Sequence, residues 1–309
     1  MLIYRIYESN LIEEKFEDFN ICDNNTYWIM MTPDELEEKN NIFNFSYQTI
    51  YDCLHNEDTP KLDVYENYSF GIINIIGPRE SSLTVTEINF YISKEYLIFV
   101  SHKHLDIFRE IQNDIYSKGS LNASLEKILF NLIDKMTNKD YNMLSKLESE
   151  ILDVEEEVLN GKTKDYAKDI MFLKNKLLFL KKHYEPLLDI VEDLIENENR
   201  ILNEKSIYYF VILFNRIERL NKKVINLCDY VTQIRESYQA QLDINLNNTM
   251  KLFTVLTAVF SPLSLIVGWY GMNFPLPEFN WKYGYVFVIT LSVIVLSFCL
   301  WIFKKKKLW

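Results

Sequence analysis

Seven positions near the C-terminal end repeat at alternating steps of three and four residues and carry mostly small or polar side chains. They are Asn247, Met250, Thr254, Thr257, Ser261, Ser264 and Gly268, and the next step reaches Gly271. This spacing places them on one face of a helix, here named the polar stripe, between flanks of Leu, Val, Ile, Phe and Trp. Polar groups in an apolar helix normally face water or other helices. The stripe therefore predicts either a pore wall or a helix-packing surface.

Acidic side chains continue the same alternation toward the N-terminus. Asp243, Glu236 and Asp229 stand on it, among Ala240, Gln233 and Asn226. If the stripe lines a pore, these carboxylates form an inner funnel that draws cations toward it. An ordinary solvated helix face explains any single one of them equally well.

The elements that carry the stripe are two apolar runs. Residues 252–270 and 283–303 contain no charged side chain, and about twenty helical residues span the ~30 Å hydrocarbon core of a bilayer. Trp and Tyr cluster near the ends of both runs, as at membrane interfaces. We predict a two-helix transmembrane domain over 251–303 rather than two core helices of a soluble protein. Two spans from one chain cannot enclose a pore, so a pore requires an oligomer.

Lysines predict the orientation of these spans. Lys251 precedes the first span and Lys304 to Lys307 follow the second, whereas the connecting loop 271–282 carries only Glu278 and Lys282. Positive charge stays on the cytosolic side. We therefore expect a multi-pass protein of the cell membrane with both termini in the cytosol, an outward loop, and a basic tail over 304–309.

Charge divides the chain in two. The net charge is −11; six lysines against one glutamate give +5 to residues 251–309, which leaves −16 for residues 1–250. An acidic body argues against nucleic acid as a partner, because phosphate binding needs a basic face. No apolar stretch of a signal peptide opens the chain, and the four cysteines show no paired spacing. We expect a cytosolic body with free thiols.

The body has two predicted parts. Residues 1–120 read as a cytosolic α/β domain, with β-rich runs at 26–32, 61–77, 82–93 and 96–102, and a helix that starts at Thr32 with Glu35 three residues later. Residues 121–250 read as long helices: an antiparallel pair, 141–160 and 169–195, and one helix from about Ser206 to Tyr270 that enters the membrane, with a slight kink at Pro262. The fold class is thus an α+β membrane protein.

Motifs of enzyme chemistry do not occur in the sequence. It contains no P-loop, no GxGxxG and no HExxH. His102-Lys103-His104 is an isolated histidine pair, for which a surface loop is the simpler interpretation than a metal site. We expect no enzymatic activity.

Taken together, these features resemble one family from end to end. "MKLFTVLTAVFSPLSLIVGWYGMNF" (250–274), the terminal "FKKKK", and the inner segments "LESEILDVEEEVL" and "YISKEYLIFVSH" are similar to segments of the CorA-type magnesium transporters. The resemblance implies a homopentamer in membrane lipid, with the first span lining a central pore for divalent cations. Mg²⁺ would be the transported ion and, as in the family, a regulatory ligand as well; Co²⁺ and Ni²⁺ are further candidates.

The same resemblance implies that Gly271, Met272 and Asn273 form a selectivity filter. Gly271 would let the helix end and the backbone turn. Asn273 would supply a ring of neutral carbonyl oxygens that accept hydrogen bonds from the waters of hydrated Mg²⁺, an ion that dehydrates reluctantly. Such a ring holds the ion loosely enough for conduction.

Two segments depart from the family pattern. Where many relatives carry acids for a regulatory metal site between subunits, this chain has Ile212 and Asn215 within "FVILFN" (210–215). After the filter, Pro275 replaces a frequent acid and leaves Glu278 as the acid of the outer loop. Two alternatives remain: a Zn²⁺ transporter of the related zinc branch, against which the intact Met272 argues, and a non-conducting membrane-tethered scaffold or sensor, against which the uninterrupted stripe argues.

Overall fold

The computed structural model describes residues 1–7, 10–19, 25–55, 59–77, 84–103, 105–117, 123–138, 140–160, 165–273 and 281–305. These residues form two compact units. Unit 1 comprises residues 1–156 and 165–233, and unit 2 comprises residues 157–164 and 234–309. One helix, α7, contributes to both units. The domain boundaries expected at residues 120 and 250 stay predictions.

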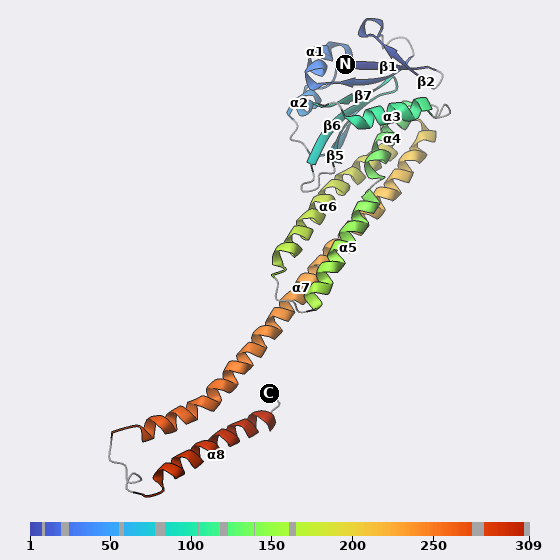
Figure 1. Cartoon of the computed structure of the whole chain (residues 1–309). Helices are drawn as coiled ribbons and strands as arrows, with labels where there is room; N and C mark the ends of the chain where they lie inside the picture. Colours follow the sequence, from blue (N-terminus) through green and yellow to red (C-terminus); the bar gives the residue numbers. More distant parts are fainter. Residues whose placement is uncertain are drawn as a thin grey trace. The chain divides into compact units, whose positions relative to one another are not determined.

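Seven strands and a group of shorter helices build the first half of unit 1 (Figure 1). In chain order they are β1 (Leu2–Tyr7), β2 (Asn10–Glu14), the 3-10 turn η1 (Phe16–Asp18), β3 (Thr26–Met31), α1 (Pro33–Phe43), α2 (Tyr47–His55), β4 (Lys61–Val64), β5 (Ser69–Gly77), β6 (Thr84–Ile92), β7 (Tyr96–Val100), α3 (Asp106–Ser117) and α4 (Leu125–Thr137). The long helices that follow are α5 (Asp140–Leu159), α6 (Ala167–Glu196), α7 (Glu204–Tyr270) and α8 (Gly284–Lys305).

The strands form one mixed sheet in the order β2-β1-β3-β7-β6-β5-β4. Only the central pair β3 and β7 is parallel, and the other neighbours are antiparallel. Every residue of β7 is buried, as expected of a strand covered on both faces. Helices α1 and α2 cover one face through side chains such as Tyr27 and Ile98. On the other face Phe99 packs against Phe108 of α3, with ring centres 5.0 Å apart and the rings tilted by 31°.

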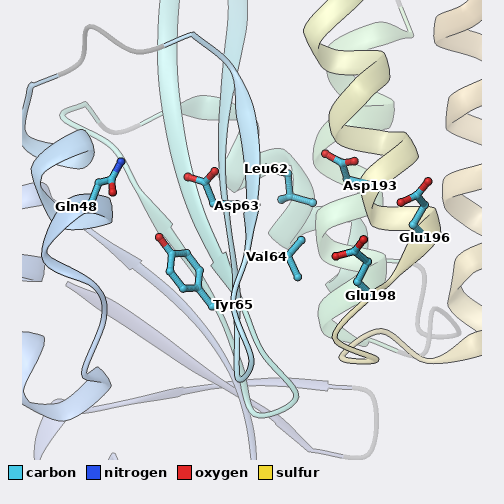
Figure 2. Close-up of a pocket in the computed structure, with 8 residues that line it drawn as sticks. All are labelled: Gln48, Leu62, Asp63, Val64, Tyr65, Asp193, Glu196 and Glu198. Atoms are coloured by element: carbon cyan, nitrogen blue, oxygen red, sulfur yellow. The ribbon is translucent and has the colours of Figure 1, made fainter.

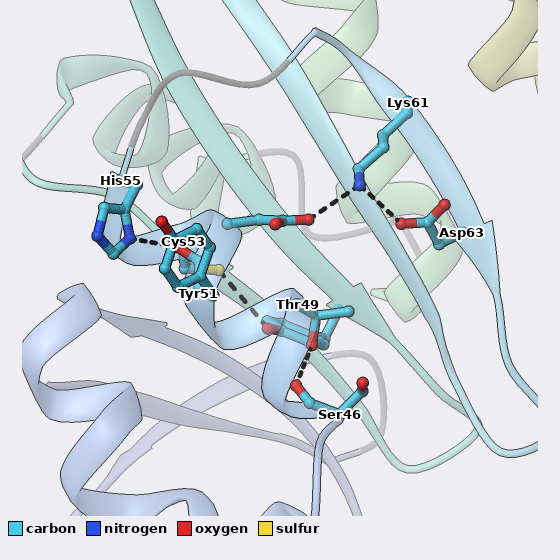
Figure 3. A network of polar contacts seen from close by, with 9 residues as sticks. Ser46, Thr49, Tyr51, Cys53, His55, Lys61 and Asp63 are labelled. Carbon is cyan, nitrogen blue, oxygen red and sulfur yellow. Dashed lines mark hydrogen bonds and ion pairs between the residues drawn. The ribbon is translucent and has the colours of Figure 1, made fainter.

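Polar side chains cross the layer between α2 and the sheet (Figure 3). Lys61 on β4 reaches Asp52 on α2 at 2.9 Å and Asp63 at 3.1 Å. Burial alone would lower the pKa of Lys61, but its bonds to these two carboxylates raise the pKa above the ordinary value. The buried thiol of Cys53 lies 3.5 Å from the Tyr91 hydroxyl, and burial raises its pKa to about 12. This thiol therefore stays protonated at neutral pH.

Ion pairs and hydrogen bonds fix how the long helices run. Glu150 of α5 meets Lys176 of α6 at 3.2 Å, and Asp140 accepts a hydrogen bond from Tyr184 at 2.9 Å, so α5 and α6 are antiparallel. Between α5 and α7, Glu148 meets Lys223 at 2.8 Å and Glu155 meets Tyr230 at 2.5 Å. The numbering rises together in these two pairs, which makes α5 and α7 parallel.

A buried seam joins α7 to the rest of unit 1. Its members recur at steps of three and four and are buried: Ser206, Phe210, Leu213, Ile217, Leu220, Val224, Leu227, Val231 and Ile234. A repeat of 3.5 residues keeps such a seam against its neighbours over many turns. Beyond Ile234 nearly every residue up to Thr254 is exposed in the single chain.

The structure confirms most expected elements. Thr32 caps α1 with a full capping box through Glu35, the antiparallel helix pair is present, and α7 is one helix that contains Pro262. The β-rich run 61–77 forms the two strands β4 and β5, because 65–68 turn the chain back on itself. The strands β1 and β2 were not expected.

A glycine in the sheet generates a stability prediction. Gly71 on β5 stands directly opposite Phe90 on β6, and a Cβ added to Gly71 would lie 2.2 Å from the Phe90 ring. Phe90 is fully buried. We expect Gly71→Ala to destabilise unit 1 by about 1–3 kcal/mol, which lowers the unfolding midpoint of the full chain in detergent by several degrees, measured by circular dichroism.

The double variant Gly71→Ala/Phe90→Leu is the control for this prediction. The smaller side chain at position 90 frees the space, so part of the lost stability should return. A midpoint of Gly71→Ala equal to that of the unmodified protein would contradict the steric argument.

Candidate functional site

The exposed face of α7 carries a second, longer seam. Continuing the polar stripe at the same alternation gives nineteen positions from Tyr208 to Gly271, and all of them are exposed in the single chain. We name this set the exposed seam; its members are Tyr208, Ile212, Asn215, Arg219, Lys222, Asn226, Asp229, Gln233, Glu236, Ala240, Asp243, Asn247, Met250, Thr254, Thr257, Ser261, Ser264, Gly268 and Gly271. In unit 1 it lies opposite the buried seam. All predicted stripe and funnel residues are thus exposed in the single chain.

Within unit 2, α8 packs on a different face of α7. Cys299 of α8 lies 3.9 Å from the Ala258 carbonyl oxygen. The partly or fully buried residues of this part of α7 are Val255, Ala258, Val259, Pro262, Leu263, Ile266 and Tyr270. At 100° per residue these positions centre on the side opposite Ser261 and Ser264. Contact with α8 therefore leaves the exposed seam free.

Burial separates α7 and α8 from core helices. In the most apolar window of each helix, the buried share of residues is 6% in α7 and 0% in α8. Core helices of a soluble protein are mostly buried, so these two helices need another environment. Their length and composition suit a membrane.

The end of α7 shows what Gly271 and its neighbours do. The Gly271 amide donates to the Val267 carbonyl at 2.9 Å, and the Met272 amide donates to the Trp269 carbonyl at 3.4 Å. The last turn thus tightens where the helix ends. A Cβ added to Gly271 would lie 2.9 Å from the Val267 oxygen, closer than real Cβ contacts. Glycine is therefore required here by space.

The side chains of the expected filter are open to solvent. Met272 and Asn273 are exposed and directly follow the helix end, so the Asn273 amide has no neighbour that fixes its direction among the described residues. The expected outer-loop acid, Glu278, lies outside the described residues.

Ile212 and Asn215, the two positions without the acids of the family pattern, lie on the seam and carry neutral side chains. Ile212 is 39% exposed, and the Asn215 side-chain amide donates to the Val211 carbonyl at 2.8 Å. Lower on the seam Asp229, Glu236 and Asp243 are exposed. Thr254 donates its hydroxyl to the Met250 carbonyl at 2.8 Å, so its oxygen still offers lone pairs to solvent.

Comparison with known proteins decides the family. The model of the CorA-like Mg2+ transporter protein family matches residues 23–306. The chain belongs to this family. The "Cobalt/magnesium transport protein CorA" of Thermotoga maritima is 25% identical, with 98% of this chain and 92% of that protein covered. The "Putative metal ion transporter YfjQ" of Bacillus subtilis is 24% identical, covering 90% and 89%.

A solved structure shares the fold. The complete structure of the CorA magnesium transporter from Methanocaldococcus jannaschii matches with a TM-score of 0.80 and 20% identity, covering 98% of this chain and 96% of that one. An α/β domain, a long helix and two C-terminal apolar helices are therefore the CorA-like architecture. Family membership and the two apolar helices together make this a membrane protein.

Sequence reasoning on this CorA-like chain missed the upper part of the seam. Arg219 and Lys222 follow the same alternation seven and four residues before Asn226. The signal was present in the spacing.

An acidic pocket also escaped the sequence argument (Figure 2). About 520 Å³ in volume, it lies between β4 and the C-terminal end of α6, with Asp63, Asp193, Glu196 and Glu198 in its wall. Burial and then the neighbouring carboxylates, Glu196 first, raise the pKa of Asp193. Among the residues that the structure describes, no three His, Cys, Asp or Glu side chains converge as metal ligands would. His104 of the histidine pair lies outside those residues.

Thiol chemistry can test which face of α7 meets water. In a chain whose four cysteines are replaced by alanine, cysteines at Ser261, Ser264 and Gly268 should react with a water-soluble thiol reagent in the assembled protein. A Cβ at Gly268 meets nothing within 4 Å, so the substitution fits. Cysteines at Ala258 and Ile266, on the face toward α8, should react at least about tenfold more slowly, because only ionised, solvated thiols react.

Mass spectrometry of the labelled full chain in proteoliposomes gives both rates. Equal labelling of the two faces would show that the polar stripe is a packing surface rather than a wall that borders water.

Proposed function

We propose that this protein is a channel-like transporter that moves divalent cations across a membrane, with Mg²⁺ as its substrate. Five copies would surround one axis, with the exposed seam of each α7 facing inward and α8 facing lipid. The observation that carries the proposal is the exposed seam. All of its positions from Tyr208 to Gly271 are exposed, and along the apolar span they lie on the side of α7 that α8 leaves free.

The chemistry of the seam suits hydrated Mg²⁺. Over its apolar span the seam offers Thr254, Thr257, Ser261 and Ser264, and Asn273 follows at its end. These are neutral oxygens, which hydrogen-bond to the waters of the ion without replacing them. Five Asn273 side chains would form the filter that hydrated Mg²⁺ meets from outside, and Gly271 and Met272 would hold them at the helix end. The names of the relatives, magnesium and cobalt transport proteins, support this class of ion.

Topology and location follow from charge. Lys251 and the basic tail place both termini and the body over 1–250 in the cytosol, and the loop with Glu278 outside the cell membrane. Asp229, Glu236 and Asp243 would then lie at the cytosolic end of the pore, where carboxylates concentrate cations.

Zinc transport is the first alternative. Zn²⁺ selects sulfur and nitrogen ligands, and none of the nineteen seam positions is a cysteine or a histidine. A scaffold without transport is the second alternative. Flux into liposomes, measured separately with Mg²⁺, Co²⁺, Ni²⁺ and Zn²⁺, distinguishes all three.

The filter assignment predicts the effect of one substitution. Asn273→Ala removes the amide oxygens and leaves the backbone unchanged, so the pentamer should still assemble while Mg²⁺ flux falls at least about tenfold. Asn248→Ala is the matched control, because Asn248 neighbours the seam but does not belong to it. Its flux should equal that of the unmodified protein. Unmodified Mg²⁺ flux in Asn273→Ala would refute the filter.

Ile212 and Asn215 generate a prediction about closure. A hard dication does not bind to an apolar side chain. It binds to a neutral amide more weakly than to a carboxylate. We expect that protection of the cytosolic body from protease rises only above low-millimolar Mg²⁺. In Ile212→Asp/Asn215→Asp, new carboxylates should shift the midpoint to about tenfold less Mg²⁺.

Ile225→Asp/Asn226→Asp serves as the control, since it adds the same charge about three turns farther along α7. A midpoint that stays the same in the 212/215 variant would mean that this level of α7 takes no part in closure.

A further inference from the structure

Charge along the exposed seam is sorted by sign. From Tyr208 to Asn226 the seam carries Arg219 and Lys222 and no acid. From Asp229 to Asp243 it carries three acids and no base. This order stands out because residues 1–250 as a whole carry −16. This stretch of the seam is therefore opposite in sign to the net charge of the body.

Neighbouring side chains offset this positive charge unequally. Lys222 contacts Glu218 one turn away at 2.6 Å, which removes part of its field. The basic side chains beside the seam have partners in other helices: Arg216 meets Asp134 at 2.5 Å and Lys223 meets Glu148 at 2.8 Å. Arg219 is exposed and forms no ion pair with any residue that the structure describes. Arg219 thus carries the larger share of uncompensated positive charge on this face.

We infer that Arg219 and Lys222 form a cation-repelling collar on the exposed seam, and that cations join the conduction path below it, beside Asp229. The inference rests on the proposed oligomer, since five inward-facing seams multiply a single arginine and lysine into a ring. Cations would therefore pass between subunits at the acidic level and not along the axis through the collar.

The distances keep the two zones apart. Lys222 and Asp229 are seven residues apart, or about 10.5 Å along the helix axis. The screening length at physiological salt is about 8 Å. The carboxylates therefore cancel only part of the collar's field. A water-filled interior with protein walls focuses the remaining electrostatic field of the collar. A dication is repelled by this field twice as strongly as a monovalent ion.

The collar also fits the neutral residues next to it. Ile212 and Asn215 lie on the same seam within two turns of Arg219. A carboxylate there would offset the collar and attract the cations that the collar repels. This end of α7 therefore offers no carboxylate on the seam to a divalent cation.

Charged thiol reagents measure this field directly. Single cysteines replace Asn215, next to Arg219, and Gln233, between Asp229 and Glu236, in the full-length cysteine-free chain in proteoliposomes. The rate of a sulfonate-bearing methanethiosulfonate is divided by that of a trimethylammonium-bearing one. We expect this anion-to-cation ratio to be about tenfold higher at Asn215→Cys than at Gln233→Cys in low salt. In 1 M salt the difference should nearly vanish.

Arg219→Gln/Lys222→Gln should lower the ratio at Asn215→Cys toward the value at Gln233→Cys. Lys174→Gln/Lys182→Gln removes the same formal charge from α6 and should leave the ratio unchanged. Equal ratios at the two positions, or a ratio at Asn215→Cys that ignores the loss of Arg219 and Lys222, would overturn the collar.

A flux measurement on the same labelled proteins tests the route. A trimethylammonium group attached at Gln233→Cys should reduce Mg²⁺ flux several-fold, and one attached at Asn215→Cys should leave it unchanged. Reduced flux at both sites would refute entry below the collar. Without flux in the unlabelled protein the proposed transport itself fails, whereas the rate ratios still report the field.

Discussion

Everything in this protein depends on one helix that keeps two opposite faces in a 3.5-residue repeat. Along its first half, α7 buries one face against its own unit, from Ser206 to Ile234, while the other face stays open. A repeat of 3.5 residues keeps the buried face against its neighbours within unit 1, where a straight helix would drift by about 20° per heptad. The opposite face is thereby kept open along this part of α7.

The composition of this track decides what it can enclose. An exposed seam of leucine and isoleucine would close into a dry coiled coil, but the seam of α7 carries amides, carboxylates and hydroxyls. Copies that meet around such a seam keep water between them, because unpaired polar groups are costly to desolvate. Within the membrane α8 covers the opposite, apolar side. The arrangement therefore separates a side that tolerates lipid from a side that needs water, as transport of a hydrated dication requires.

The sequence could predict those parts of the fold that carry a clear local signal, such as a long apolar run, a helical spacing of apolar residues or a capping motif. The two charge-free runs, the helix pair and the cap at Thr32 are such cases, and the structure contains all of them. Short strands were harder: Leu2–Tyr7 and Asn10–Glu14 are defined mainly by pairing with each other and with β3, which local sequence does not encode. The run 61–77 contains a hairpin whose turn is marked only by the short polar pair Glu66-Asn67 between Tyr65 and Tyr68. At the site, the periodic stripe was predictable, whereas the acidic pocket joins β4 to α6 and needed the tertiary fold.

Two departures on the upper seam have one physical meaning when they are considered together. Replacing acids by Ile212 and Asn215 removes hard-cation ligands, and placing Arg219 and Lys222 one to two turns below adds repulsion for the same ions. Either change alone would weaken divalent binding at this level of α7. Both changes together leave the acids of the lower seam, beginning at Asp229, as the first seam carboxylates along the helix. The acids of the seam are thereby confined to Asp229, Glu236 and Asp243, on the stretch of α7 that leads to its apolar span.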